Sequence, residues 1–218
     1  MRMYQNETIE WTRVWREQAD SEKPRVLLIG DSIVDGCKGH LYNRLVRDGY
    51  VTTTFVTSKA VNNPFYLREI ELLCEQEYND YRAVYLQYGG HLGSQSREVC
   101  RENYSSVVKR MKTIMPGVPL ILGSFTPLTE GNGHEKDHDT PVTFQVAYKE
   151  TNKKILELRE DVREIASNMN LEFFDAYALM EKVPEYKLPD GVHFNDYGNL
   201  FLGTAIAEKI LSVIKSTI

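Results

Sequence analysis

The sequence predicts a three-layer α/β/α fold, in which a doubly wound parallel sheet of five strands has helices on both faces. Two observations carry this prediction. Short apolar or β-branched runs alternate along the chain with longer stretches of helical periodicity. The runs are apolar at nearly every position, which is typical of strands buried on both faces of a parallel sheet. Right-handed crossovers then favour the flavodoxin-like strand order 2-1-3-4-5.

Each element has its own local signal. β-Branched residues dominate the run at 51–56, proline stands in the first turn of the helix at 64–77, and Pro116-Gly117 ends the helix before the fourth strand. The strands are expected at 26–29, 51–56, 81–87, 118–123 and 171–174. The helices are expected at 6–20, from about 40 onward, and at 64–77, 96–115, 142–169 and 195–215.

Length and charge limit the possible functions. At 218 residues the chain has the size of one domain, expected to span 1–218, with an N-terminal helix and linker at 1–23 packed on it. A net charge of −5 and scattered basic residues argue against a nucleic-acid partner. No apolar run approaches the ~20 residues of a membrane span, and the N-terminus lacks an apolar signal core. The sequence therefore predicts a cytoplasmic protein, unless a signal peptide has been removed.

The cysteines predict a reduced protein. Cys37, Cys74 and Cys100 are odd in number and widely spaced, so free thiols are expected and not a disulfide framework. Cys37 is close to Ser32 in sequence, but nothing nearby supplies a second catalytic constellation for it. It is interpreted as a small packing residue.

Ser32 lies at the carboxyl end of the first predicted strand, where Gly30 ends the apolar run. Open α/β sheets bind their ligands at this edge. A helix N-terminus close to Ser32 would also favour negative charge that develops there. The alternative is that Ser32 only caps the helix, which is the commonest role of a serine before a helix.

Asp190 and His193 lie three residues apart on one predicted loop before the last helix. This spacing allows the carboxylate to bond one imidazole nitrogen and leaves the other nitrogen for a serine. Ser, Asp, His is one known chain order of such triads. With Gly-Asp-Ser at 30–32 and Asp-Gly-Val-His at 190–193, the sequence resembles the GDSL/SGNH hydrolase family over roughly residues 24–215.

The resemblance implies a catalytic triad of Ser32, His193 and Asp190, with an oxyanion hole to which the Ser32 backbone N–H contributes. Where the family usually has a glycine N–H donor, this sequence has Lys59, which keeps the N–H but loses the freedom to adopt positive φ. Where the family has the Asn of Gly-x-Asn-Asp, this sequence has His91, whose ring N–H would replace the amide. Otherwise, His91 is an ordinary loop histidine.

The activity that the resemblance implies is hydrolysis of a small-molecule ester with a small acyl group, such as an acetylated carbohydrate or other metabolite, without a metal or organic cofactor. A lysophospholipase or thioesterase is the alternative within the enzyme class. The two departures from the family pattern also allow a binding protein that kept the fold and lost turnover. The presence of all three triad residues favours the enzyme.

Residues 124–142 are expected to form a long loop, which in a compact domain is usually functional or mobile. The loop contains a His-Glu-x-x-His pattern from His134 to His138, which formally matches a zinc motif. That motif needs a helix, so that both histidines face one metal. Glycines before the pattern and a proline after it argue against a helix, so a charged loop tip near the mouth of the site is expected. Asp175, after the last strand, is expected to be a structural anchor.

Overall fold

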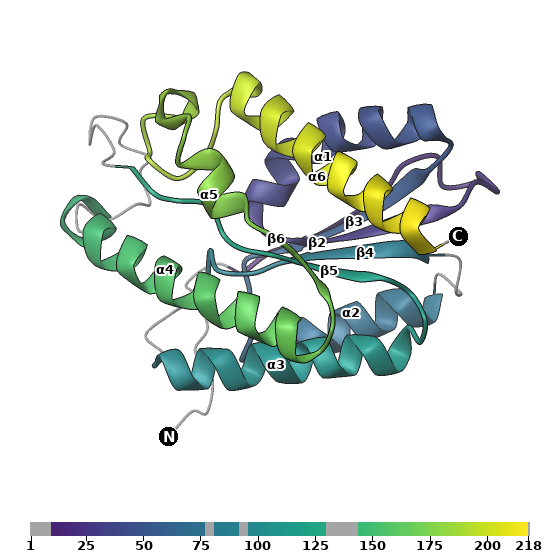
Figure 1. Cartoon of the computed structure of the whole chain (residues 1–218), viewed down its shortest axis with the longest axis horizontal. Helices are drawn as coiled ribbons and strands as arrows, with labels where there is room; N and C mark the ends of the chain where they lie inside the picture. The colour runs from purple at the N-terminus through teal and green to yellow at the C-terminus, as the bar shows by residue number, and fades with distance from the viewer. Residues whose placement is uncertain (1–9, 77–80, 92–95, 130–143, 218) are drawn as a thin grey trace.

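The computed structural model describes residues 10–76, 81–91, 96–129 and 144–217. Its centre is a six-stranded sheet with helices on both faces (Figure 1). The strands lie in the order β1-β3-β2-β4-β5-β6. The strands from β2 to β6 are parallel, and their order is the predicted 2-1-3-4-5. The three-layer fold class is therefore confirmed, with one strand more than predicted.

The bounds of most elements agree with the sequence pattern to within a few residues. The strands are β1 (Thr12–Arg16), β2 (Arg25–Gly30), β3 (Val51–Thr57), β4 (Tyr81–Gln87), β5 (Leu120–Gly123) and β6 (Glu172–Phe174). The helices are α1 (Ser32–Leu45), α2 (Pro64–Gln76), α3 (Arg97–Ile114), α4 (Phe144–Asn168), α5 (Ala176–Met180) and α6 (Asp196–Thr217), with 3-10 turns η1 (Val46–Asp48) and η2 (Pro184–Tyr186).

The additional strand, β1, corrects the prediction of a helix at 6–20. β1 pairs antiparallel with β3, so that Val14 lies opposite Phe55. The pairing supplies partners for backbone groups at the edge of β3, and the aromatic and β-branched residues of β1 suit a strand. Most of β1 is exposed, so backbone pairing and not an apolar face determines its structure. Residues 6–9 of the predicted helix lie outside the described residues.

The first helix of the α/β unit begins earlier than predicted. The sequence pattern placed its start near residue 40, whereas α1 begins at Ser32. The cap is Asp31, whose side chain accepts a hydrogen bond from the backbone N–H of Ile33 at 3.0 Å. Ser32 is therefore the first helical residue, and the alternative that it is only the helix cap is wrong.

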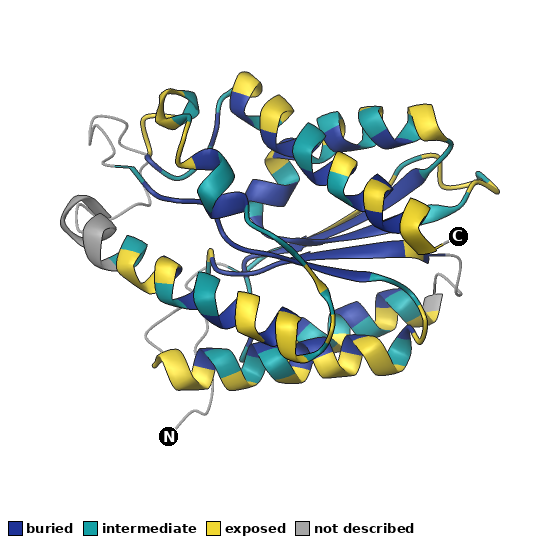
Figure 2. Cartoon of the chain, in the orientation of Figure 1, coloured by how far each residue is buried: buried dark blue, intermediate teal, exposed yellow. Residues whose placement is uncertain are grey.

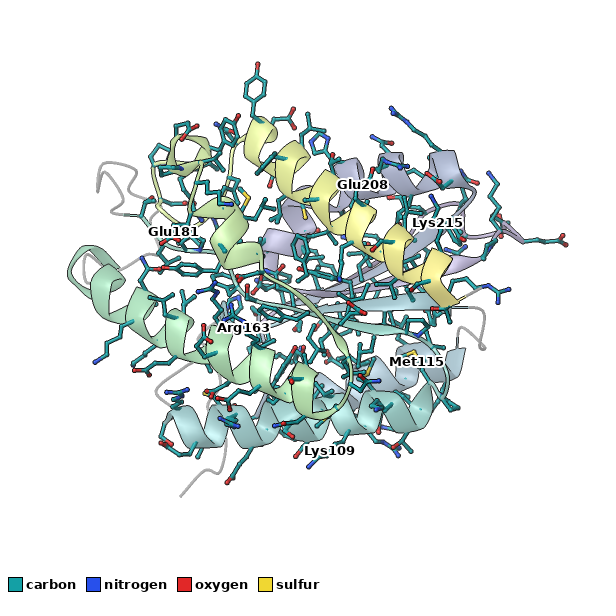
Figure 3. All side chains as sticks on the ribbon, viewed as in Figure 1. Lys109, Met115, Arg163, Glu181, Glu208 and Lys215 are labelled. Atoms are coloured by element: carbon teal, nitrogen blue, oxygen red, sulfur yellow. The ribbon has the colours of Figure 1, made fainter. Side chains whose placement is uncertain are left out.

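Two apolar layers hold the sheet between the helices. The strands in the middle of the sheet are buried, while the outer faces of the helices carry the exposed side chains (Figure 2). Helices α1, α5 and α6 cover one face, and α2, α3 and α4 cover the other (Figure 1). Side chains fill the space between the sheet and both layers (Figure 3). None of the described helices is long and apolar enough to cross a membrane.

Two smaller expectations are confirmed. Cys37 is buried in the core, as expected of a small packing residue, and burial raises the pKa of its thiol to about 12. Asp175 caps α5 and pairs with Arg159 at 2.6 Å and Arg163 at 2.9 Å, so it is a structural anchor.

The sequence predicts no helix or strand in two long regions between elements. Residues 175–194 lie between the last predicted strand and the last predicted helix, but the chain forms α5 and η2 there. In the predicted loop at 124–142, residues 124–129 have no helix or strand. The His-Glu-x-x-His pattern from His134 to His138 lies outside the described residues.

Candidate active site

Ser32, His193 and Asp190 form one line of hydrogen bonds. The Nε2 atom of His193 lies 2.8 Å from Oγ of Ser32, and the Nδ1 atom lies 2.6 Å from Oδ2 of Asp190. Since an ionised carboxylate only accepts, Nδ1 carries the proton and donates it to Asp190. In a neutral imidazole, Nε2 is then free to accept from the Ser32 hydroxyl. The structure thus brings together the three residues that the sequence predicted.

The position of Ser32 follows from the turn between β2 and α1. As the first residue of α1, Ser32 belongs to the turn whose backbone N–H groups have no partner within the helix. The helix dipole adds partial positive charge at the same end. The Ser32 hydroxyl and its own backbone N–H therefore lie where an anion would be stabilised.

The Asp190–His193 segment is fixed by its own backbone. The Oδ1 atom of Asp190 accepts the N–H groups of Val192 at 2.8 Å and His193 at 2.9 Å. The carbonyl of His193 accepts from the N–H of Leu188 at 2.9 Å, which closes the loop at its base. Both carboxylate oxygens of Asp190 are thus occupied, and the His193 ring is held in one orientation.

Lys187 also holds the Asp190–His193 segment in place. Its ammonium group donates to the carbonyl of Val192 and lies 3.7 Å from the centroid of the Phe194 ring. Burial lowers the pKa of Lys187 to about 7, against the opposing effect of Asp190. A cavity of about 200 Å³ lies beside Lys187, between the segment at 127–129 and α5. This role of Lys187 could not be predicted, because a single lysine between the last predicted strand and helix carries no signal of burial in the sequence.

The electrostatics of Asp190 reflect these contacts. Partial burial would by itself raise the pKa of the carboxyl group, but the hydrogen bonds from the His193 ring and from the two backbone N–H groups outweigh it. The net effect lowers the pKa of Asp190 from 3.8 to about 2. Asp190 is therefore ionised over the whole range in which an esterase would operate.

This shift predicts a specific loss of stability in acid. Because the pKa of Asp190 is lower in the folded chain, the unfolded chain binds more protons between about pH 4 and pH 2. The stabilisation from Asp190 is therefore complete above that window and is lost as the pH falls through it. We expect the difference in free energy of unfolding between the wild type and Asp190→Asn to shrink from pH 5 to pH 2, as measured by urea denaturation. A difference that stays constant across this range would contradict the expectation.

Asp31 is a buried carboxyl group behind Ser32. Its Oδ1 accepts from Ile33, and the backbone N–H of Gly90 also bonds its carboxylate. Burial raises the pKa of Asp31, while the charges of His91 and His193 oppose the rise. A Cβ atom at Gly90 would overlap with Oδ2 of Asp31, so only glycine allows this approach. The Gly89-Gly90 pair after β4 is the one signal in the sequence from which this contact could have been predicted.

Lys59 and His91, the two predicted oxyanion residues, line one small cavity beside the turn that carries Ser32. The cavity has a volume of about 10 Å³, and its wall includes Gly30, Asp31 and Gly90. The sheet brings the ends of β3 and β4 to either side of β2, which explains why residues so distant in sequence meet here.

The hydrogen bonds of Lys59 limit its predicted role as an oxyanion donor. Its backbone N–H donates to Oγ1 of Thr57 at 3.2 Å, a long hydrogen bond. Its ammonium group points away to Oγ1 of Thr12 at 2.7 Å and to Glu69 at 3.1 Å. The Lys59 N–H is therefore already engaged, and it could serve an oxyanion only by sharing or exchanging that bond.

Comparison with known proteins supports the same fold. No family model matches the sequence, and no curated protein matches it. The chain is similar to a carbohydrate acetylesterase from Sinorhizobium meliloti, with a TM-score of 0.69 and 17% identity over 88% of this chain and 100% of that chain. It is also similar to a catalytic mutant of an acetylxylan esterase from Geobacillus stearothermophilus, with a TM-score of 0.60 and 17% identity over 86% and 94% of the two chains.

A third similar structure is described as a GDSL-like lipase from Parabacteroides merdae, with a TM-score of 0.62 and 16% identity over 86% of this chain and 96% of that chain. At these identities the likeness establishes the fold. The chain has the GDSL/SGNH hydrolase fold, as its two motifs predicted.

Proposed function

We propose that the protein is a serine ester hydrolase that transfers a small acyl group from an alcohol to water. The observation that carries this proposal is the pair of hydrogen bonds that joins Ser32 to His193 and His193 to Asp190. A serine hydroxyl is a weak nucleophile at neutral pH and needs an adjacent base, which in turn needs a group that orients it. The three side chains have the contacts that these roles require.

The proposed reaction has two steps. In the first, Oγ of Ser32 attacks the ester carbonyl carbon while Nε2 of His193 takes the hydroxyl proton. The protonated His193 then gives this proton to the leaving alkoxide, and an acyl-enzyme remains. In the second step His193 deprotonates a water molecule that attacks the acyl group, and the acid leaves as Ser32 regains its proton. Asp190 keeps the ring in its productive tautomer and stabilises the imidazolium ion.

The negative charge on the carbonyl oxygen needs fixed donors. We assign this role to the backbone N–H of Ser32 and to a ring N–H of His91. The N–H of Lys59 is a third donor if it shares or exchanges its 3.2 Å bond to Thr57. The N-terminus of α1 adds favourable potential for the same charge.

The proposal of a small acyl group is supported by the limited space beside the proposed oxyanion donors. The cavity lined by Lys59 and His91 has a volume of about 10 Å³, which is close to the space of one water-sized probe. This space is too small for a long acyl chain, which would need an extended apolar channel. Two of the similar structures act on acetyl esters of carbohydrates by name, and we propose the same class of substrate here.

A series of nitrophenyl esters tests this proposal against its alternatives. We expect kcat/KM to be highest for the acetate and to fall as the acyl chain grows to octanoate. A rise of kcat/KM with chain length would instead support a lysophospholipase or thioesterase. Wild-type protein that turns over none of these esters, nor acetylated oligosaccharides, would support the binding-protein alternative.

His91 is the position at which the proposed site departs most from its apparent family. A neutral imidazole has one N–H in either tautomer, with a reach close to that of an asparagine amide. We therefore expect His91→Asn to keep much of the activity. His91→Ala is expected to cost ~3 kcal/mol in the transition state, as for other single oxyanion donors. Steady-state kcat values for the two variants provide the comparison, and two near-wild-type values would remove His91 from the mechanism.

A further inference from the structure

Exposed apolar side chains gather at the beginning of α6, next to the loop that carries Asp190 and His193. The exposed fraction is 72% for Tyr197, 47% for Leu200, 40% for Phe201 and 40% for Leu188. Tyr186 of η2 is half-buried and joins them to complete what we call the aromatic patch: Tyr186, Leu188, Tyr197, Leu200 and Phe201. Contiguous exposed apolar groups of this kind commonly mark a binding surface.

The rings of the aromatic patch are arranged as a group. The Tyr186 centroid lies 6.4 Å from that of Tyr197 at an interplanar angle of 29°, and 6.4 Å from that of Phe201 at 64°. Gly198 makes this arrangement possible, because a Cβ atom there would lie 2.9 Å from Cβ of Tyr186. The chain thus brings η2 close to α6 and groups two exposed rings, Tyr197 and Phe201, around the half-buried ring of Tyr186.

The aromatic patch is joined to the proposed active site by a short stretch of chain. Leu188 donates its backbone N–H to the carbonyl of His193, so it forms the base of the same loop. Tyr197 follows His193 by four residues, which limits the distance between their Cα atoms to about 15 Å. The start of α6 is also held against α1 by a 2.8 Å contact between His40 and Asp196. An ester held at Ser32 whose alcohol part is a short chain of sugars could therefore reach these rings.

The chemistry of the aromatic patch favours a neutral polyol. Aromatic faces stack on the C–H faces of sugar rings, and tyrosine adds a hydroxyl that remains in water. The carboxylates of Glu185 and Asp196, next to Tyr186 and Tyr197 in the chain, are exposed and can accept hydrogen bonds from sugar hydroxyls, Asp196 through the oxygen that does not contact His40. The same carboxylates would repel the surface of an anionic membrane.

We propose that the aromatic patch binds the carbohydrate part of an oligosaccharide ester and so selects the substrate of the adjacent site. The role in substrate selection rests on the proposed esterase function, but the sugar binding itself does not. A short sugar chain stacked on Tyr197 and Tyr186 would then reach the loop of His193 with its ester group. The substrate class is then an acylated oligosaccharide, not a free acylated monosaccharide.

Binding to protein that carries Ser32→Ala tests the proposal without any turnover. The probes are xylotetraose and cellotetraose, titrated by NMR or calorimetry. We expect at least one of the two oligosaccharides to bind. Adding Tyr197→Ala to the Ser32→Ala protein is expected to raise Kd fivefold or more, whereas adding Tyr197→Phe should leave Kd close to that of the parent. Leu156→Ala is the matched control, because Leu156 has a similar exposure of 39% but lies on α4. This control is expected to leave Kd unchanged.

Kinetics give the second readout. With acetylated xylotetraose, Tyr197→Ala is expected to raise KM, relative to the KM for nitrophenyl acetate, by fivefold or more. The proposal is overturned if neither oligosaccharide binds, or if Tyr197→Ala binds as the parent does. It is equally overturned if the aromatic patch is found instead to drive association of two copies or binding to lipid vesicles. An inactive wild type with sugar binding intact would overturn only the esterase function.

Discussion

Replacing Ser32 by alanine is expected to lower kcat/KM for ester hydrolysis by ~10³-fold or more, the scale found for triad nucleophiles. The variant loses the oxygen that lies 2.8 Å from Nε2 of His193, so no acyl-enzyme can form. Folding should change little, since Asp31 and not Ser32 caps α1. Initial rates with nitrophenyl acetate, together with a thermal melt, measure both effects.

The control for this substitution is Ser212→Ala, which removes an exposed serine hydroxyl from α6. We expect this variant to keep wild-type activity. Wild-type rates of hydrolysis in clean Ser32→Ala protein would exclude Ser32 as the nucleophile.

The second large effect concerns His193 and Asp190 as one unit. His193→Ala is expected to lower kcat by ~10³-fold or more, because Ser32 then has no base. Adding Asp190→Ala to His193→Ala should cost little more, since Asp190 acts only through the ring to which it is bonded at 2.6 Å. Steady-state kcat for both single variants and for the double variant shows whether the effects are additive.

His40 provides a matched control, because its Nε2 lies 2.8 Å from a carboxylate oxygen of Asp196 in a similar exposed His–Asp pair. We expect His40→Ala to change kcat by less than about twofold. If the penalties of His193→Ala and Asp190→Ala multiply, the two residues do not serve the same step, and the proposal that Asp190 acts through His193 is wrong.

Much of the fold could be predicted because its signals are local. The apolar run of β2 and the helical periodicity of α3 and α6 each identify one element, and topology rules then order the parallel strands. The start of α1 was misplaced because Gly36 and Gly39 weaken the helical pattern just after Ser32. β1 was mistaken for a helix because its structure depends on a partner, the edge of β3.

The residues of the proposed triad could be picked out in the sequence because each is marked by a short motif. The hydrogen bonds around these residues could not be predicted, because they join segments that are distant in the sequence. The bond between the Gly90 N–H and Asp31 joins two loops and has no local signature. The long bond from the Lys59 N–H to Thr57, and the donation from Lys187 to Val192, depend equally on backbone geometry.

The central claim, that Ser32 is an activated nucleophile, is tested most directly by reaction with an aryl fluorophosphonate. Such a reagent phosphonylates a serine that an adjacent base activates, by the same attack that would form the acyl-enzyme. Mass spectrometry of the intact protein followed by peptide mapping locates the adduct. We predict one adduct, on Ser32, that is absent from Ser32→Ala and forms much more slowly in His193→Ala. Wild-type protein that stays unmodified, or that is modified at another residue, would contradict the claim.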